Sequence, residues 1–302
     1  MPTIWLDGEW LDRDTAKVSV FDHGLLYGDG VFEGIRVYGG KVFRLAEHMD
    51  RLYASARAVN LDIGISKTDL TAIVEDAVKR SGLREAYIRP LVTRGVGDLG
   101  IDPRNCARPT VMVIVDTIRI WAEDRYDKGL ACVTAATPIP HRESLSPRVK
   151  SLNYLPHVLA KMEGNVAGAD EIIMMDSSGH VCEGSGQNLF VVNGRTLRTP
   201  PPNAGILVGI TRNAVMELAL HAGYAVREEM LNRYDVYTAD EAFLTGTASE
   251  IVGLRSLDGR SIGAGKPGPV TRDLMARFRE LVRADEPRTR QGVEGRVARV
   301  ES

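Results

Sequence analysis

The sequence predicts a mixed α/β protein of two domains, and three observations support this fold class. The 302 residues are enough for two compact domains with sizeable cores. The chain opens with strand-like runs linked by tight turns, whereas its second half alternates strand-like runs with helical ones. A polar and charged stretch, residues 122–128, separates the halves and is the predicted linker. The predicted domains therefore span residues 1–121 and 129–284.

The first predicted elements are two β-hairpins. Residues 3–6 and 9–11 flank Asp7-Gly8, a dipeptide that favours a tight turn, and a second hairpin surrounds Gly39-Gly40. The segment between the hairpins, residues 22–34, contains too many glycines to be regular throughout.

Two predicted helices follow, over residues 45–59 and 68–80. The first has an apolar stripe of Leu45, Met49, Leu52, Ala56 and Val59. Arg51 lies beside this stripe and is therefore predicted to be partly buried, where an arginine needs an anionic partner. A neighbouring carboxylate is the ordinary partner for such a side chain. Strands are predicted at residues 86–92 and 109–120.

The loop between these two strands contains G-V-G-D-L-G at residues 95–100, which matches a dinucleotide-binding motif by its letters. That motif requires a helix to begin directly afterwards, and I-D-P-R-N follows instead. The sequence therefore argues against a nicotinamide cofactor.

The second half is predicted to contain six strands and three helices. The strands are expected at residues 130–134, 171–175, 179–182, 188–192, 241–245 and 251–256, and the helices at residues 153–167, from Thr211 onward and at 270–283. The last segment, residues 285–302, is charged and almost free of large apolar residues, which predicts disorder.

Lys150 is the centre of the predicted site. It lies in S-P-R-V-K-S-L-N, which has neither helical nor alternating periodicity, so a loop is expected, where most lysines are simply solvated. Later features supply what a lysine-bound aldehyde cofactor needs. Glu183 could partner a ring nitrogen, and the small-residue segments 209–211 and 246–249 could bind phosphate through backbone amides, although both also resemble ordinary caps. Together these residues predict a pyridoxal 5′-phosphate site.

The chemistry of this site assigns separate roles to its members. Lys150 is predicted to be both the Schiff-base anchor and the general acid and base, whereas Glu183 would keep the ring nitrogen protonated. A surface carboxylate at a strand end is the alternative for Glu183. Tyr87 and Arg89 alternate along one strand and share a face, which suits a dicarboxylate substrate. A salt-bridged Arg89 at a sheet edge is the alternative.

Seven motifs in a consistent order make the chain resemble branched-chain aminotransferases, which are class IV (fold-type IV) pyridoxal-phosphate enzymes. The motifs are Y-G-D-G-V-F-E-G, F-R-L-A-E-H-M-D-R-L, Y-I-R-P, K-S-L-N-Y, E-G-S-G-Q-N-L-F, G-I-T-R and G-T-A-S-E-I. The resemblance covers about residues 3–283. It implies a small N-terminal α/β domain, a larger C-terminal barrel-like domain with helices, and ping-pong transamination between L-leucine, L-isoleucine or L-valine and 2-oxoglutarate.

The resemblance also implies which residues form the site. The cofactor would be bound by Arg51, Lys150, Tyr154, Glu183, Ile210, Thr211, Gly246 and Thr247. The substrate would be bound by Tyr27, Phe32, Gly34, Tyr87, Arg89, Leu99, Ile101, Thr247 and Ala248. Tyr27 and Phe32 are expected at the edge of a cavity, with core packing as the alternative.

An oligomer is implied as well, because Leu99 and Ile101 would reach the neighbouring subunit's active site. A homodimer is the minimum, and a larger assembly of dimers is possible. Where the family usually has P-W-G, this sequence has I-W-A-E-D-R-Y with Trp121 and Tyr126, so one wall of the substrate pocket is not specified.

Composition excludes several other classes of protein. A net charge of -2 gives no basic surface for nucleic acid or an anionic membrane. Three cysteines without a CxxC pair, and six histidines without ligand spacing, indicate neither a disulfide framework nor a metal site, and a cytoplasmic setting is expected. The sequence shows no secretory signal at its start, and residues 110–120 are too few to span a bilayer.

Three alternative functions stay open at this point. A transaminase of the same fold could act on D-amino acids or (R)-amines, and a lyase similar to aminodeoxychorismate lyase would use the same lysine and glutamate positions. A non-catalytic oligomeric scaffold is the third.

Overall fold

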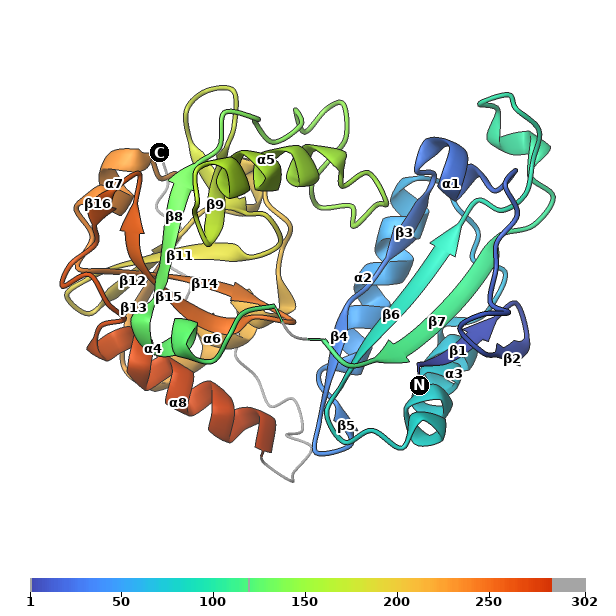
Figure 1. Cartoon of the computed structure of the whole chain (residues 1–302), viewed down its shortest axis with the longest axis horizontal. Helices are drawn as coiled ribbons and strands as arrows, with labels where there is room; N and C mark the ends of the chain where they lie inside the picture. Colours follow the sequence, from blue (N-terminus) through green and yellow to red (C-terminus); the bar gives the residue numbers. More distant parts are fainter. Residues whose placement is uncertain (1, 119, 284–302) are drawn as a thin grey trace.

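The computed structural model describes residues 2–118 and 120–283, and the predicted disordered tail lies outside them. The chain forms two domains side by side, each built around its own β-sheet (Figure 1). The first part of the chain forms the right-hand domain in this view, and the later part forms the left-hand domain. The mixed α/β fold predicted from the sequence is confirmed.

The first sheet is antiparallel throughout the described residues. Its order is β2-β1-β7-β6-β4-β5, and β3 also pairs with β6. Both predicted hairpins are present, and Asp7 and Gly8 make the first turn with positive φ angles of 47° and 101°. The strands are β1 (Thr3–Leu6), β2 (Glu9–Leu11), β3 (Gly30–Phe32), β4 (Ile35–Tyr38), β5 (Lys41–Val42), β6 (Ala86–Thr93) and β7 (Thr110–Asp116).

Helices α2 (Leu45–Ala58) and α3 (Lys67–Ser81) pack against this sheet and bury a common core. The predicted stripe on α2 is confirmed, because Met49, Leu52 and Ala56 are all buried in that core. The glycine-rich segment is not regular throughout, as expected, because residues 28–29 and 33–34 lie outside helices and strands. It contains β3 and a short helix, α1 (His23–Tyr27), capped by Asp22, and a 3-10 turn (Pro103–Asn105) lies in the later loop.

The second sheet closes into a barrel. Its strand order is β10-β9-β8-β15-β14-β11-β12-β13, and an additional pairing of β10 with β11 joins the ends of a six-stranded path within the described chain. Glu183 and Asn188 form that closing pair. The strands are β8 (Leu130–Thr134), β9 (Glu171–Met175), β10 (Val181–Gly184), β11 (Asn188–Asn193), β12 (Thr196–Thr199), β13 (Ala225–Glu228), β14 (Glu241–Gly246), β15 (Glu250–Leu257) and β16 (Arg260–Ser261).

The predicted strands and helices of this domain are present, but its shorter elements were not predicted. β12, β13, β16 and helix α7 are too short, at two to five residues, to show a clear period in the sequence. The helices are α5 (Leu155–Val166), α6 (Ile210–His221), α7 (Arg233–Tyr237) and α8 (Pro269–Arg283), with a 3-10 turn at Pro202–Ala204.

The chain crosses between the sheets after β7 and before β8, where the linker was predicted. The polar stretch is not wholly extended, because it contains helix α4 (Asp124–Lys128). Trp121 and Tyr126 pack against the core of the second domain, so this part of the crossing belongs structurally to that domain. Among the described residues, no helix is long and apolar enough to cross a bilayer.

Besides the covalent crossing, side chains at the corner between β5 and α2 also join the two domains. Phe43 packs against the core of the second domain and lies 5.7 Å, between ring centroids, from Phe278 on α8. Arg44 forms a two-pronged ion pair with Glu217 on α6. The space between the domains is therefore bounded by fixed contacts.

Candidate active site

The Lys150 segment is fixed to the first domain by backbone hydrogen bonds. Phe32 N donates to the Lys150 carbonyl at 3.0 Å, and Leu152 N donates to the Gly30 carbonyl at 3.0 Å. The Lys150 side chain donates from Nζ to the Tyr154 hydroxyl at 3.0 Å. The predicted loop is thus an ordered extension beside β3, and its amine lines a cavity of about 440 Å³ between the domains.

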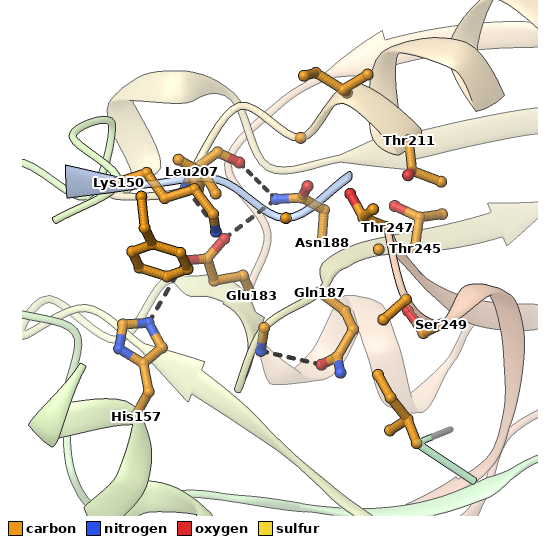
Figure 2. A pocket seen from close by; sticks show the side chains of 18 of the residues that line it. Lys150, His157, Glu183, Gln187, Asn188, Leu207, Thr211, Thr245, Thr247 and Ser249 are labelled. Atoms are coloured by element: carbon orange, nitrogen blue, oxygen red, sulfur yellow. Dashed lines mark hydrogen bonds and ion pairs between the residues drawn. The ribbon is translucent and has the colours of Figure 1, made fainter. Parts of the chain in front are cut away.

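Glu183 enters the same cavity from the barrel. Its Oε2 accepts hydrogen bonds from Asn188 Nδ2 at 3.2 Å and from Leu207 N at 3.1 Å, while His157 Nε2 lies 3.8 Å from Oε1 (Figure 2). Glu183 is buried, so the alternative of a surface carboxylate is wrong. Two donors hold one carboxylate oxygen and leave the other without a hydrogen bond from the described residues.

An aromatic wall lies beside the lysine. Phe32 and Tyr154 meet edge to face at 5.1 Å between ring centroids, and Tyr154 stacks on His157 at 4.7 Å. Lys150 Nζ lies 4.6 Å from the centroid of the Phe32 ring. The lysine amine therefore lies beside the rings of Phe32 and Tyr154.

The opposite corner of the cavity presents hydroxyls and backbone amides. Thr211 lies in the first turn of α6, and Thr247 follows the end of β14 in the turn to β15. Figure 2 places the hydroxyls of Thr211, Thr245 and Thr247 close together. The hydroxyls of Thr245 and Ser249 are buried without a hydrogen-bond partner among the described residues. Since a buried unpaired hydroxyl is costly, this corner fits an oxygen-rich anion such as phosphate.

Two glycines keep this corner open. A Cβ atom on Gly209 would lie 2.1 Å from Asn188 Oδ1, and one on Gly246 would lie 2.7 Å from Ser249 Oγ. Ile210, the residue after Gly209, also lines the cavity, as do Gly246 and Ala248. The predicted phosphate segments therefore meet in space although they are far apart in the sequence.

Arg51 lines the cavity and has the carboxylate partner that its burial required. Arg51 Nε donates to Glu33 Oε1 at 2.6 Å, Nη2 donates to Glu33 Oε2 at 2.9 Å, and Nη1 donates to the Val208 carbonyl at 2.7 Å. Burial would raise the pKa of Glu33, but the charge of Arg51 and the hydrogen bonds from Arg51 and His48 outweigh it and lower that pKa to about 2. Glu33 was not predicted.

Tyr87 and Arg89 share a face of β6, as predicted, and both line the cavity. Arg89 Nη2 donates to the Tyr87 hydroxyl at 3.1 Å, and its guanidinium lies 4.6 Å from the Phe32 ring. The alternative of a salt-bridged arginine at a sheet edge is wrong. β6 lies inside the sheet, and Arg89 pairs with no carboxylate in the described part of the chain.

Gly34 also lines the cavity, and its lack of a side chain makes room for Tyr87. A Cβ atom at this position would lie 1.9 Å from the Tyr87 hydroxyl oxygen. Ile118 and Ile120, in the crossing segment, add apolar surface on the same side. These two isoleucines were not predicted as site residues, because an apolar residue after a strand carries no chemical signal.

Tyr27, Leu99 and Ile101 do not line this cavity. Leu99 is 70% exposed and Ile101 is 82% exposed, and the Tyr27 hydroxyl donates to the Leu99 carbonyl. The expectation that Tyr27 borders the cavity therefore fails for the cavity of a single chain. The three residues form a separate apolar surface, and their role at a neighbouring subunit's site stays a prediction.

Sequence reasoning missed other residues of the cavity. His157, Gln187 and Asn188 all line it, and a polar residue in a helix or at a strand end gave no signal of its own. Asn188 was part of the Q-N-L-F motif but was not assigned a role. Among the described residues, no group of three or more His, Cys, Asp or Glu side chains could hold a metal ion.

Comparisons with known proteins identify the family of this chain. The family model described as Amino-transferase class IV matches residues 30–257. A putative branched-chain-amino-acid aminotransferase of Methanocaldococcus jannaschii is 48% identical over 279 residues, covering 92% of this chain and 96% of that protein. The branched-chain-amino-acid aminotransferase of Escherichia coli (strain K12) is 38% identical and covers 91% of each chain.

Solved structures give the same result. A crystal structure of the Escherichia coli branched-chain amino acid aminotransferase has a TM-score of 0.90 at 36% identity and covers 93% of this chain and 94% of that one. The branched-chain amino acid aminotransferase of Thermoproteus uzoniensis, solved with norvaline, has a TM-score of 0.87 at 35% identity and covers 93% of this chain and 94% of that one. The fold, the cavity and these relatives together show that the chain belongs to the class IV aminotransferases.

Proposed function

We propose that this chain catalyses pyridoxal-phosphate-dependent transamination between an L-branched-chain amino acid and 2-oxoglutarate. The products are the branched 2-oxo acid and L-glutamate, released in a ping-pong cycle. The observation that carries this proposal is the convergence of Lys150 and Glu183 on one cavity that also holds buried hydroxyls without partners among the described residues. The relatives named as branched-chain aminotransferases supply the substrate class. One solved relative, a branched-chain amino acid aminotransferase with a TM-score of 0.89, contains pyridoxamine 5′-phosphate.

Cofactor binding is assigned to residues on both domains. Glu183 would face the ring nitrogen, Tyr154 the ring oxygen, and Arg51 the phosphate, together with Ile210, Thr211, Gly246 and Thr247. The bound cofactor supplies an electron sink for the carbon that loses its proton. Glu183 would favour a protonated ring nitrogen, because one oxygen of its buried carboxylate accepts no hydrogen bond from the described residues.

Lys150 is the proposed anchor and proton carrier. Its Nζ atom lies inside the cavity beside Tyr154, and no carboxylate is paired with it in the described chain. An amine that is not tied up in an ion pair can bind an aldehyde and, once released by the substrate, move a proton at the substrate α-carbon.

Substrate selection is assigned to the face opposite the phosphate corner. Phe32, Ile118 and Ile120 supply apolar surface for a branched side chain, while Arg89 offers a charge that has no carboxylate partner among the described residues. Tyr87 would orient the α-carboxylate and Arg89 the distal carboxylate of 2-oxoglutarate or glutamate, with Gly34, Thr247 and Ala248 contributing close backbone contact. One cavity can thus accept apolar and acidic substrates in turn.

The proposal includes a cytoplasmic homodimer or a larger assembly of dimers. Its support is the exposed apolar surface of Tyr27, Leu99 and Ile101, which a second subunit would cover while completing that subunit's substrate pocket.

Absorbance spectroscopy tests the proposed function directly. Purified protein incubated with pyridoxal phosphate is expected to show a visible band that L-leucine bleaches and 2-oxoglutarate restores. Bleaching by a D-amino acid or an (R)-amine, but not by L-leucine, would replace the substrate assignment and keep the family. Absence of any band after cofactor addition would reject the proposed function.

A further inference from the structure

Glu33 is a fully buried carboxylate with no role in the proposed function, although it touches a residue that has one. It lies at the end of β3, between Phe32 and Gly34, which both line the cavity. Its own side chain is 0% exposed and does not line the cavity. A buried carboxylate normally requires a charged or hydrogen-bonding partner, because desolvation of its charge is unfavourable.

Both oxygens of this carboxylate accept hydrogen bonds, one at Oε1 and three at Oε2. Oε1 accepts from Arg51 Nε at 2.6 Å, and Oε2 accepts from Arg51 Nη2 at 2.9 Å, His48 Nδ1 at 2.7 Å and Gly34 N at 3.2 Å. His48 and Arg51 lie three residues apart on α2 and so point to the same side. The Glu33 backbone N–H donates to the Pro90 carbonyl at 2.8 Å, which fixes the carboxylate relative to β6.

These hydrogen bonds use only part of the N–H groups of Arg51. Nε and one Nη2 proton go to Glu33, and one Nη1 proton goes to the Val208 carbonyl. Each terminal nitrogen therefore keeps one N–H group, and Arg51 lines the cavity. Val208 directly precedes Gly209, the N-cap of α6, so the same guanidinium is tied to both domains beside the predicted phosphate corner.

We propose that Glu33 is a positioning residue for the cofactor phosphate. It holds the Arg51 guanidinium in one orientation before the phosphate binds, so that two N–H groups already face the site. This inference rests on the proposed function, because it takes the phosphate corner to be a cofactor site. It goes further by assigning part of the phosphate affinity to a carboxylate that never touches the ligand.

A negative charge near a phosphate site also has an opposite effect that must be weighed. Glu33 neutralises Arg51, and burial, together with the charges of Arg51 and Lys150, lowers the pKa of His48 and so favours its neutral form. The charge of Glu183 also raises the pKa of Arg51, although less than Glu33 does. If the net charge governed affinity, removing Glu33 would tighten phosphate binding. If orientation governs it, removing Glu33 would weaken phosphate binding.

Orientation is the stronger effect in this geometry. The Arg51 side chain on α2 is partly buried, and it has no other carboxylate within ion-pair distance in the described chain. A glutamine at position 33 would direct an N–H group at the guanidinium, which has only donors, so the forked contact would be lost. Arg51 would then have to be reoriented by the ligand itself, and that ordering reduces affinity.

The experiment compares pyridoxal phosphate with pyridoxal, which carries the same aldehyde and ring but no phosphate. Dissociation constants of both are measured for apo wild type and Glu33→Gln in phosphate-free buffer, by absorbance and by equilibrium dialysis. The quantity of interest is the dissociation constant of pyridoxal divided by that of pyridoxal phosphate, a ratio that reports the contribution of the phosphate alone. Glu33→Gln is expected to reduce this ratio by about tenfold or more, the size of one charge-assisted hydrogen bond, and to change pyridoxal binding by less than about twofold.

Three further variants decide how Glu33 acts. Glu171→Gln removes another buried carboxylate, paired with Lys161 at 3.4 Å outside the cavity, and is expected to leave the ratio unchanged. In an Arg51→Lys background, Glu33→Gln is expected to have less than about a threefold effect, because the forked donor it positions is gone. If Glu33→Gln does not fold, Glu33→Asp, which keeps the charge but shortens the side chain, carries the same expectation for the ratio.

The outcomes separate the two proposals. Wild-type protein that binds no pyridoxal phosphate would reject the proposed function itself. Wild-type binding with an unchanged or larger ratio in Glu33→Gln would overturn the positioning role, and a larger ratio would show that Glu33 competes with phosphate as a counter-ion. An equal effect of Glu33→Gln in wild-type and Arg51→Lys backgrounds would also overturn it.

Discussion

Replacing Gly34 by alanine is expected to weaken 2-oxoglutarate binding through Tyr87. The new methyl would lie 1.9 Å from the Tyr87 hydroxyl oxygen and 2.7 Å from Tyr87 Cζ. Ordinary contact needs about 3.5 Å, so the hydroxyl must retreat by roughly 1.5 Å. Gly34 does not have a left-handed backbone, so alanine adds bulk without backbone strain.

This displacement breaks the 3.1 Å hydrogen bond from Arg89 Nη2 to the Tyr87 hydroxyl. A hydrogen bond to a charged group contributes about 1.5–3 kcal/mol, which corresponds to roughly a ten- to hundredfold rise in the KM for 2-oxoglutarate. A loss confined to substrate binding would raise KM and leave kcat less affected.

Steady-state kinetics with L-leucine held constant measures this change, and the cofactor band confirms that the site stays loaded. Tyr87→Phe should raise the same KM, and adding Gly34→Ala to it should have little further effect, since both act on one contact. Gly186→Ala is a useful comparison, because it adds a methyl to the same cavity where no atom lies within 4 Å. A Gly34→Ala enzyme whose KM for 2-oxoglutarate stays within about twofold of wild type would refute the assignment of Tyr87 and Arg89 to this substrate.

Three further predictions concern other parts of the site. Lys150→Ala is expected to lower the rate of cofactor bleaching by L-leucine at least about a thousandfold, as measured in single-turnover experiments, because the proton carrier is lost; a rate within about tenfold of wild type would contradict this role. Glu183→Gln should lower kcat by about a hundredfold, with pyridoxal phosphate still bound, because a neutral amide cannot favour a protonated ring nitrogen; an unchanged kcat would argue against that contact. The pKa of Glu33 is lowered from 4.5 to about 2 in the folded protein. Its ionised carboxylate therefore stabilises the fold fully above about pH 4.5, and this contribution is lost as the pH falls toward 2. The urea-measured stability difference between apo wild type and Glu33→Gln should therefore shrink by roughly 2 kcal/mol between about pH 5 and pH 3, and a constant difference would show that the carboxylate is not held ionised.

The sequence predicted well those features that are local or periodic. The helix stripe of Met49 and Leu52, the turn at Asp7-Gly8 and the alternation of Tyr87 with Arg89 each follow from a period that a few neighbouring residues reveal. Lys150 and Glu183 could be assigned because their side chains carry chemistry and lie in recognisable motifs. Most of the residues that the resemblance implied for the site line the cavity, whereas Tyr27, Leu99 and Ile101 do not.

Long-range pairing and burial could not be predicted in the same way. A glutamate such as Glu33 is usually exposed, so nothing in the sequence indicated that it is buried. Its burial as an anion depends on the contacts of His48 and Arg51 from α2. Ile118 and Ile120 line the cavity because the crossing between the sheets carries them there. Tyr27 lies in a motif next to cavity residues, but its hydroxyl donates to the Leu99 carbonyl and the residue does not line this chain's own cavity.

The barrel's parallel pairing has a consequence for the order in which the chain can fold. All strands of the first sheet have been synthesised once the chain reaches residue 116, because β7, which pairs with β1 and β6, is its last strand in the sequence. The barrel requires β8 to pair with β15, where Leu130 pairs with Leu254 and Cys132 with Leu257. The barrel therefore cannot close until β15 has been synthesised. During synthesis, the first domain can therefore form as a platform well before the barrel closes. Glu183 reaches its place opposite Lys150 only after nearly the whole chain has left the ribosome.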